Sequence, residues 1–291
     1  MPTTAIPRVS AIVVSHNSGA DLARCVSDLL AQSVPVEVIV VDNASDDGSL
    51  ADLPVDARLQ RIDNPDNRGF AVACNQGAAQ ARAEHLMFVN PDCRLPVDAV
   101  ERLLKHLQSN PELGLLGARL CDADGRPQAA AERRTPHPAI AIKAALGLRQ
   151  QLEIAPEPQD ADTPLRYVEA TSGALMLMPR PLFEALGGFD PGYVLHCEDL
   201  DLCRRVLAAD RRIAIATDVS ITHLKGTSSR RRPIWVEWQK HRGMWRYFRK
   251  FDAATSPWWL RILVAAGICA HFPLAALRAW WNRGSGLQPR R

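Results

Sequence analysis

Several features that define common protein classes are missing from this sequence. None of its seven cysteines forms a C-x-x-C pair, which disfavours a zinc site or a disulfide framework and favours reduced thiols in a cytosolic compartment. Residues 1–8 contain no apolar core, so we expect no secretory signal peptide there. No glycine-rich phosphate loop follows the apolar run that ends at Val14, which disfavours a sugar-phosphate nucleotidyltransferase.

Acidic residues are nearly absent from the last part of the chain. Residues 225–291 contain 14 Lys and Arg against 2 Asp and Glu, whereas the whole chain has a net charge of +3, so residues 1–224 carry −9. The chain has 47% hydrophobic and 23% charged residues, values that are typical of a globular protein rather than a disordered one. A basic tail on an acidic body suggests an anionic partner, such as a phospholipid surface or a nucleic acid.

The tail also lacks the run of about 20 apolar residues that spans a bilayer. Residues 262–277 carry no formal charge, but they number 16 and are interrupted by His271 and Pro273. Basic and aromatic residues are interleaved in the preceding segment, 230–250. This pattern suits a peripheral or monotopic attachment to the cytoplasmic face of the plasma membrane better than binding to nucleic acid. The alternative is a helical hairpin that is buried against the rest of the chain or in a homodimer.

What the sequence does contain is a regular alternation of β-branched runs and amphipathic segments, which predicts an α/β fold with a largely parallel sheet. We expect a loop between the second strand and the second helix. The predicted strands lie at 9–14, 36–41, 86–89, 168–178 and 211–216, and the predicted helices at 21–32, 71–83, 97–108, 179–186 and 198–209.

Polar side chains follow the predicted strands. Because parallel strands that a helix joins end at the same edge of a sheet, the turn at 15–17 and Asp42 should face each other across one crevice. A carboxylate there can accept hydrogen bonds from a nucleobase or from ribose hydroxyls. Asp92 ends the next strand and is either a ligand for Mg²⁺ or Mn²⁺ or a turn residue. Arg68, beside a helix start, is a candidate phosphate partner or a surface arginine.

Motifs in a fixed order connect these positions across residues 8–229. They are Asp42-Asn43-Ala44-Ser45, Asn67-Arg68-Gly69-Phe70, Asn75-Gln76-Gly77, Asn90-Pro91-Asp92, Gly187-Gly188-Phe189-Asp190, Glu198-Asp199-Leu200-Asp201-Leu202-Cys203-Arg204-Arg205 and residues 219–223. This set resembles the family 2 glycosyltransferases, which are nucleotide-sugar enzymes of the GT-A fold. Within that family it is similar to a subgroup that includes bacterial rhamnosyltransferases and galactofuranosyltransferases of cell-envelope synthesis. The resemblance implies a doubly wound GT-A domain over residues 1–229 and a helical extension over 230–291.

The resemblance also implies roles for matched residues. Asp92 corresponds to the last carboxylate of an Asp-x-Asp metal motif in which Asn90 replaces the first, so we expect weak metal binding without the donor. His223 would complete the metal shell, and its imidazole favours Mn²⁺ over Mg²⁺. Asp199 would be the base that deprotonates the acceptor, with Glu198 beside it. The residues implied at the nucleotide-sugar are Ser15, His16, Asn17, Asp42, Asn43, Arg68, Gly69, Asn75, Asn90 and Asp92.

Residues 122–166 lose the strand and helix alternation and are rich in Pro, Ala and charge, which predicts a mobile segment. The resemblance places that segment at the acceptor side of the site.

The sequence therefore predicts an inverting, metal-dependent glycosyltransferase with a nucleotide-diphosphate sugar donor. The subgroup resemblance alone favours L-rhamnose from dTDP-rhamnose, transferred to a lipid-linked or polysaccharide acceptor. The alternatives are a UDP-sugar donor, such as galactofuranose or an N-acetylhexosamine, and a catalytically silent protein that binds nucleotide-sugars or serves as a membrane scaffold.

Overall fold

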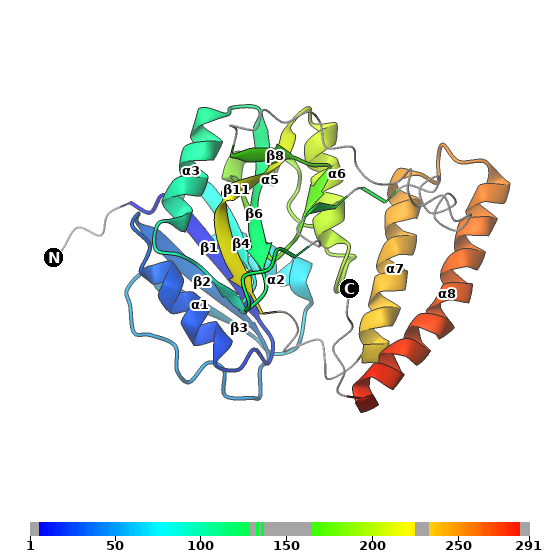
Figure 1. Cartoon of the computed structure of the whole chain (residues 1–291), viewed down its shortest axis with the longest axis horizontal. Coiled ribbons are helices and arrows are strands. Elements are labelled where there is room, and N and C mark those ends of the chain that lie inside the picture. The colour runs from blue at the N-terminus through cyan, green and yellow to red at the C-terminus, as the bar shows by residue number, and fades with distance from the viewer. Residues whose placement is uncertain (1–5, 129–131, 134, 137–163, 225–232, 286–291) are drawn as a thin grey trace.

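The computed structural model of the chain describes residues 6–128, 132–133, 135–136, 164–224 and 233–285. Its centre is a mixed sheet with helices on both faces (Figure 1). The sheet that the described residues form has nine strands, with the order β3-β2-β1-β4-β10-β6-β11-β5, and β8 pairs with β11 beside this path. The strands are β1 (Val9–Ser15), β2 (Val36–Asn43), β3 (Leu59–Asn64), β4 (His85–Val89), β5 (Cys93–Arg94), β6 (Leu113–Cys121), β8 (Leu165–Tyr167), β10 (Leu175–Pro179) and β11 (Arg212–His223).

Pairing within the sheet is mostly parallel. The strands β3, β2, β1 and β4 are parallel neighbours, and β6 and β11 form a second parallel pair. Antiparallel β10 lies between β4 and β6, and β5 and β8 pair antiparallel with β11. A second, two-stranded sheet joins β7 (Glu132–Arg133) to β9 (Ala170–Thr171). The predicted α/β class with a largely parallel sheet is confirmed.

Helices on each face of the sheet bury one apolar side. The bounds are α1 (Asp21–Leu30), α2 (Phe70–Gln80), α3 (Ala99–Ser109), α5 (Arg180–Ala185) and α6 (Glu198–Ala208). One core cluster contains side chains of α1 and α3, and the other contains side chains of α2, α5 and α6. Because both faces are covered, β1 and β2 are buried along their whole length, which explains why their sequences are mostly apolar.

Strands β3 and β6 are the longest of the strands that were not predicted, and one predicted strand is longer than expected. Strand β3 occupies part of the expected loop, and its residues are mostly polar because it forms the edge of the sheet. Strand β6 contains Gly117, where a Cβ atom would lie 2.2 Å from the Thr171 hydroxyl, so glycine is needed for close strand packing. Strand β11 continues past Ala216 to His223 through a register shift before Ser220. Because of this irregularity, only the first half of the strand was predicted.

The C-terminal residues form a hairpin of α7 (Pro233–Phe251) and α8 (Trp258–Ser285), with α7 beside α6 and α8 on the outside (Figure 1). Asp252, just after α7, pairs with Arg204 of α6 at 2.7 Å. A Cβ atom on Gly243 of α7 would lie 3.0 Å from the His196 carbonyl oxygen. One side of α7 thus packs closely on the sheet-containing domain, and the predicted boundary at residue 229 stays a prediction.

The apolar part of the tail is also longer than the uncharged run suggests. Helix α8 has 28 residues and continues through Pro273. Its segment Trp258–Ala279 is long and apolar enough to cross a membrane, by length and composition. The length argument that disfavoured a spanning helix is therefore wrong.

Candidate active site

Asp42 and the turn after β1 lie at the same edge of the sheet, as predicted. Ser15 and Asp42 are direct partners in the parallel pairing of β1 with β2. The Asp42 carboxylate is 3% exposed, and it accepts hydrogen bonds from the Ser45 hydroxyl at 2.5 Å and the Ser45 backbone N–H at 2.9 Å. These two bonds fix the orientation of the carboxylate. Ser45 was not among the predicted site residues, although it closes the Asp42-Asn43-Ala44-Ser45 motif.

Hydrogen bonds join the loops after β1 and β2 into one unit. The Asn17 backbone N–H donates to the Ser45 hydroxyl at 3.0 Å, and the Asn17 side-chain oxygen accepts from the Asp46 N–H at 2.9 Å. The His16 Nδ1 lies 2.8 Å from the Asn43 carbonyl oxygen. Asn17 adopts a left-handed conformation with φ of 54°, which asparagine tolerates better than most residues. These hydrogen bonds thus hold the two loops together at this edge of the sheet.

Asn43 and Gly69 belong to a second network, behind this edge. The Asn43 side-chain oxygen accepts from Asn64 at 2.9 Å, and its amide nitrogen donates to the Gly69 carbonyl at 3.3 Å. Gly69 has a φ of 81°, and a Cβ atom there would lie 2.6 Å from the Val194 carbonyl oxygen. The chain needs glycine here because the backbone segment that leads to α6 passes so close.

Two predicted nucleotide-sugar residues have other partners. Both polar atoms of the Asn75 side chain bond the Phe189 backbone, donating at 2.8 Å and accepting at 2.9 Å. These bonds give Asn75 a structural role, and its predicted contact with the nucleotide-sugar stays a prediction. Arg68 pairs with Asp66 at 2.6 Å, and both side chains are largely exposed. A surface ion pair of this kind holds its partners weakly, so Arg68 stays a candidate that an incoming phosphate can attract.

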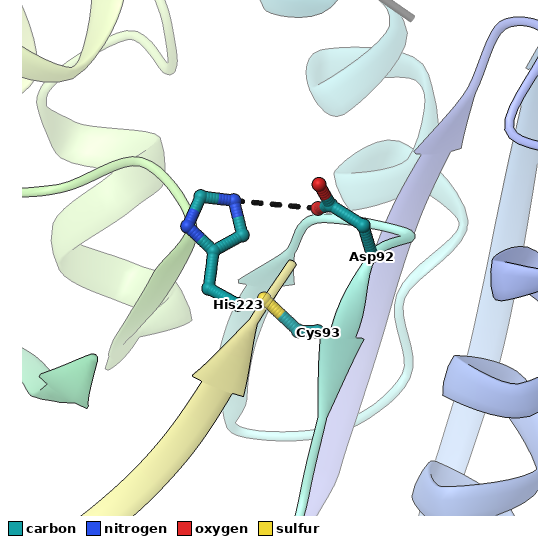
Figure 2. A group of neighbouring side chains, drawn as sticks. All are labelled: Asp92, Cys93 and His223. Carbon is teal, nitrogen blue, oxygen red and sulfur yellow. Dashed lines mark ion pairs between the residues drawn. The ribbon is translucent and has the colours of Figure 1, made fainter. Parts of the chain in front are cut away.

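The two predicted metal ligands face each other across the ends of β5 and β11 (Figure 2). The pairing of these strands sets Cys93 opposite His223, next to Asp92. The His223 Nε2 lies 3.3 Å from the Asp92 Oδ1, and both side chains are about nine-tenths buried. The structure therefore brings together a carboxylate oxygen and an imidazole nitrogen, which suit a divalent cation such as Mn²⁺.

Cys93 lies in the same group of possible ligands, but its chemistry disfavours a role there. The thiol is fully buried and lies 3.4 Å from the Ala174 carbonyl oxygen. Burial raises the pKa of the Cys93 thiol well above its usual value, which disfavours the thiolate. A protonated thiol is a poor ligand for Mn²⁺ or Mg²⁺, which prefer oxygen donors.

Two further side chains surround His223. The Asn90 amide nitrogen lies 3.4 Å from its Nε2, and the Gln128 side-chain oxygen lies 3.2 Å from its Nδ1. Asn90 was predicted at this site, and Gln128 was not, because it falls in the segment 122–166 that was predicted to be mobile. Residues 122–128 form an ordered turn after β6, and residues 165–166 belong to β8. Most of the segment between them lies outside the described residues.

A short chain of contacts connects the predicted base, Asp199, to the loop that follows β4. The Asn90 backbone N–H donates to the Ala174 carbonyl at 2.9 Å, and the neighbouring Gly173 N–H donates to the Asp199 carboxylate at 3.1 Å. The Leu200 N–H donates to the other carboxylate oxygen at 2.8 Å. Asp199 is 5% exposed. The Gly173 N–H therefore fixes Asp199 beside the loop that follows β4.

The backbone just before Asp199 is strained. His196 and Cys197 are consecutive non-glycine residues with φ values of 67° and 71°. Such conformations cost on the order of 1–3 kcal/mol each and persist where the surroundings enforce them. In this protein α7 packs against them, because Gly243 brings the helix next to His196 and Cys197. Glu198 and Asp199 follow directly as the first two residues of α6.

Cations of α7 bind the acidic residues on either side of this strained turn. Lys250 contacts the carboxylates of Asp190 and Asp201 at 2.8 and 2.7 Å, and Arg246 contacts Asp190 at 2.7 Å. Burial alone would raise the pKa of Asp190, but the hydrogen bonds from Arg246 and Lys250 outweigh burial and lower the pKa to about 2. The basic segment 230–250 was predicted to meet a membrane, and Arg246 and Lys250 within it pair with carboxylates of this chain.

The match to a family model decides the identity of this site. The model of Glycosyl transferase family 2 matches residues 10–184. The chain is a family 2 glycosyltransferase. The predicted family is thus confirmed, and the Asp42, Asp92 and Asp199 positions lie in a glycosyltransferase.

Named relatives of this family 2 glycosyltransferase include two bacterial proteins. An N-acetylglucosaminyl-diphospho-decaprenol L-rhamnosyltransferase of Mycobacterium tuberculosis (strain ATCC 25618 / H37Rv) is 27% identical over 243 residues, covering 76% of this chain and 78% of that protein. The O-antigen biosynthesis protein RfbC of Myxococcus xanthus is 28% identical over 262 residues, covering 83% of this chain but 20% of that longer protein. The family 2 glycosyltransferase thus resembles bacterial rhamnosyltransferases.

Solved structures confirm the fold of the family 2 glycosyltransferase. The mannosyltransferase PcManGT from Pyrobaculum calidifontis, in complex with GDP-Man and Mn²⁺, aligns with a TM-score of 0.57 at 20% identity and covers 98% of this chain and 78% of that one. A GalNAc-T7 structure with UDP, GalNAc and Mn²⁺ aligns with a TM-score of 0.60 at 16% identity and covers 84% of this chain and 48% of that one. The predicted GT-A fold is confirmed.

Proposed function

We propose that this family 2 glycosyltransferase is an inverting, metal-dependent enzyme that transfers L-rhamnose from dTDP-rhamnose to a lipid-linked or cell-surface glycan acceptor. The observation that carries the proposal is the arrangement of Asp92, His223 and Asp199 at the edge of the sheet that also holds Asp42. The Mycobacterium tuberculosis relative, named as a rhamnosyltransferase with a lipid-linked acceptor, supports the choice of sugar and acceptor class.

Asp42 and the turn at residues 15–17 are the proposed nucleotide contacts. Ser45 donates two hydrogen bonds to the Asp42 carboxylate, and these bonds fix the carboxylate at the end of β2. A carboxylate that is held in this way can accept a hydrogen bond from a base imide N–H or from a ribose hydroxyl. The rigid connection of the two loops through Asn17 and Ser45 positions these groups before the nucleotide arrives.

Asp92 and His223 are the residues that would hold the cation. Their donor atoms are one carboxylate oxygen and one imidazole nitrogen, which fit Mn²⁺ and, less well, Mg²⁺. When bound, the cation would stabilise the negative charge that grows on the departing diphosphate. Asn90 is neutral, so two protein donors carry one negative charge between them, and we expect the diphosphate oxygens to complete the shell.

Asp199 is the proposed catalytic base. Hydrogen bonds from the Gly173 and Leu200 backbone orient its carboxylate, and the strained turn before α6 fixes where the helix starts. The acceptor hydroxyl gives its proton to Asp199 while its oxygen bonds to the anomeric carbon. The bond between that carbon and the diphosphate oxygen breaks on the opposite face, and the configuration inverts.

The base is tested by Asp199→Asn, which keeps the size of the side chain and removes its basicity. We expect sugar transfer to fall by a factor of about 100 or more, while calorimetry shows donor affinity close to that of wild type. Glu184→Gln is the matched control, because Glu184 is an exposed carboxylate on α5. Transfer by Asp199→Asn at the control rate would exclude Asp199 as the base.

The donor is tested with a panel of UDP-, dTDP- and GDP-sugars, scored for Mn²⁺-dependent diphosphate release with membrane extract as acceptor. Selective turnover of dTDP-rhamnose supports the proposal. Turnover of UDP-galactofuranose or of a UDP-N-acetylhexosamine would replace rhamnose by a UDP-linked sugar. Binding of donors without any turnover would instead favour a catalytically silent nucleotide-sugar-binding or scaffold protein.

We also propose that the helical hairpin of α7 and α8 attaches the enzyme to the cytoplasmic face of the membrane. None of the apolar segment Trp258–Ala279 is buried within the described chain, although α8 packs along α7. The large apolar side chains that stay exposed on α8 are Trp258, Trp259, Ile262, Leu263, Leu274, Leu277 and Trp281. Tryptophans near both ends of such a helix are typical of a membrane interface.

The packing of α7 against α8 favours an in-plane helix over a spanning one. His241 stacks on His271 with ring centroids 5.2 Å apart, and Trp238 contacts Phe272 at 5.5 Å. Phe272 lies well inside the apolar segment, so a spanning α8 would carry the charged residues of α7 into the bilayer core. Lysine and arginine are costly at that depth. The docked hairpin thus supports monotopic attachment, with α8 between the lipid and α7.

Attachment is tested by co-sedimentation of the full chain with vesicles of phosphatidylglycerol and phosphatidylcholine. We expect Leu263→Glu with Leu274→Glu to release the protein from the vesicles. Val97→Glu is the matched control, because Val97 is an exposed apolar residue outside the hairpin, in the segment before α3. If the double variant sediments like wild type, α8 is not the lipid contact. If the double variant also converts a dimer into a monomer in light scattering without vesicles, a second copy covers this face instead.

A further inference from the structure

We propose that Gln128 is a positioning residue that selects the imidazole tautomer of His223 and so directs the Nε2 lone pair toward the cation. The inference rests on the proposed metal site and adds a residue to it that neither the motifs nor the comparisons assign. Gln128 is 9% exposed and lies beside the imidazole ring on the side away from Asp92, because it contacts Nδ1 while Asp92 contacts Nε2.

Two backbone carbonyls determine how the Gln128 amide is oriented. Its nitrogen donates to the His223 carbonyl at 2.7 Å and to the Cys121 carbonyl at 3.1 Å. A carbonyl oxygen accepts hydrogen bonds and cannot donate them, so the NH₂ group must face these two atoms. The amide oxygen is consequently the atom that faces the imidazole Nδ1 of His223, at 3.2 Å.

The orientation of the amide in turn favours one tautomer. An amide oxygen only accepts, so it favours the proton on the Nδ1 of His223. With the proton on Nδ1, the neutral ring keeps the Nε2 lone pair on the side of Asp92 and Asn90. The Asp92 carboxylate, whose Oδ1 lies 3.3 Å from Nε2, also only accepts hydrogen bonds, so in the absence of a cation Gln128 and Asp92 compete for the ring proton. The Asn90 amide can donate to it at 3.4 Å. Without Gln128, the ring is free to place its proton on Nε2, where a cation cannot bind.

The position of Gln128 follows from long-range pairing in the sheet. Parallel pairing places Cys121 of β6 opposite Thr222 of β11, the residue before His223. A tight turn then returns the chain, and the Gln128 backbone N–H donates to the Leu120 carbonyl at 2.7 Å. Gln128 is thereby fixed to the ends of both strands at once. Partners of this kind, which orient a metal-binding histidine through its second nitrogen, change metal affinity by about 10-fold to 100-fold when they are lost.

The test compares Gln128→Met with Gln32→Met. Gln32 is a matched control, because it is 8% exposed, its nitrogen donates to two backbone carbonyls, and its oxygen accepts from the Val100 N–H. It lies on the loop after α1 and does not contact the histidine. Thermal unfolding and circular dichroism of both variants verify that the fold is retained.

The first readout is the tautomer, and it needs no metal. Long-range ¹H–¹⁵N correlation spectra of the metal-free protein, with His223 assigned from His223→Gln, should show a population with the proton on Nδ1 in wild type and in Gln32→Met. In Gln128→Met we expect the population to move toward the Nε2–H form. A wild-type spectrum without any Nδ1–H population, or an unchanged spectrum in Gln128→Met, would overturn the proposal.

The second readout is the dissociation constant of Mn²⁺, measured by electron paramagnetic resonance in the presence of a nucleoside diphosphate. We expect it to rise about 10-fold in Gln128→Met and to stay at the wild-type value in Gln32→Met. Equal affinities in Gln128→Met and wild type would overturn the role toward the cation. If wild type binds no Mn²⁺ but shows the Nδ1–H form, the metal dependence of the proposed function fails, while the selection of the tautomer by Gln128 is upheld.

Discussion

Lys250 is the cation through which α7 contacts the acidic motifs around the proposed base. Its ammonium group lies 2.8 Å from Asp190 and 2.7 Å from Asp201. Asp201 is fully buried, and its other oxygen pairs with Arg205 at 2.6 Å. Replacement of Lys250 by methionine keeps much of the apolar stem and removes the charge, so it isolates the contribution of these ion pairs.

The expected loss of stability follows from the burial of the two carboxylates. Removing one charged partner from a buried carboxylate costs about 1.5–3 kcal/mol. The Lys250 side chain is 33% exposed, and Asp190 keeps its bond to Arg246, so water and the remaining partners offset part of this cost. We expect a net loss of about 2 kcal/mol in the free energy of unfolding. For a chain of this size the midpoint of thermal unfolding should fall by about 4–8 °C.

Thermal and urea unfolding of Lys250→Met test this value against Lys240→Met. Lys240 lies on the same helix and forms a single pair with Glu237 three residues away, with 43% of its side chain exposed. Its removal should change the free energy of unfolding by less than about 0.5 kcal/mol. Hydrogen exchange should also become faster in residues 190–197 of Lys250→Met alone. If both variants unfold at the same temperature, the ion pairs of α7 do not stabilise this part of the site.

Three more outcomes follow from the geometry. Gly69→Ala should destabilise the protein by about 1–3 kcal/mol in urea unfolding, and by more than Gly48→Ala, because both glycines have a positive φ but only at Gly69 would a Cβ atom meet a carbonyl oxygen, that of Val194, at 2.6 Å. The carboxyl of Asp190 has a pKa of about 2 when folded against an ordinary value of 3.8, so its stabilisation is complete above about pH 4 and is lost as the pH falls toward 2. Stability measured across this range should therefore fall more steeply in wild type than in Asp190→Asn. Asp42→Asn should weaken donor binding in calorimetry by about 10-fold, and an unchanged affinity would exclude a carboxylate contact with the nucleotide.

The core of the fold could be predicted from the sequence because its strands correspond to local apolar patterns. Apolar runs at residues 9–14 and 36–41 could only be strands with both faces covered, and the helices between strands carry one apolar side. Strands β3 and β6 have no such pattern. Strand β3 lies at the edge of the sheet and is mostly polar, and glycines interrupt the apolar residues of β6. Both were missed for that reason.

The candidate site was predictable where it depends on the ends of strands. Parallel pairing places Ser15 beside Asp42, and this follows from the order of strand and helix alone. The pairing of Asp92 with His223 was implied only by the family motifs. No local pattern connects these two residues, because 130 positions lie between them in the chain. Asn75 shows the limit of a motif, because its place in the pattern did not reveal that both of its polar atoms bond Phe189.

The sequence by itself determined the class of fold, the family and the residues that carry the proposed chemistry, because periodicity and short motifs are local properties of the chain. Only the tertiary structure decided which polar side chains meet. Gln128 reaches His223 because β6 and β11 pair in one register, and Lys250 reaches Asp190 and Asp201 because α7 packs on the domain. Ion pairs and hydrogen bonds act over a few ångströms, so the register of distant strands and the docking of distant helices select the partners.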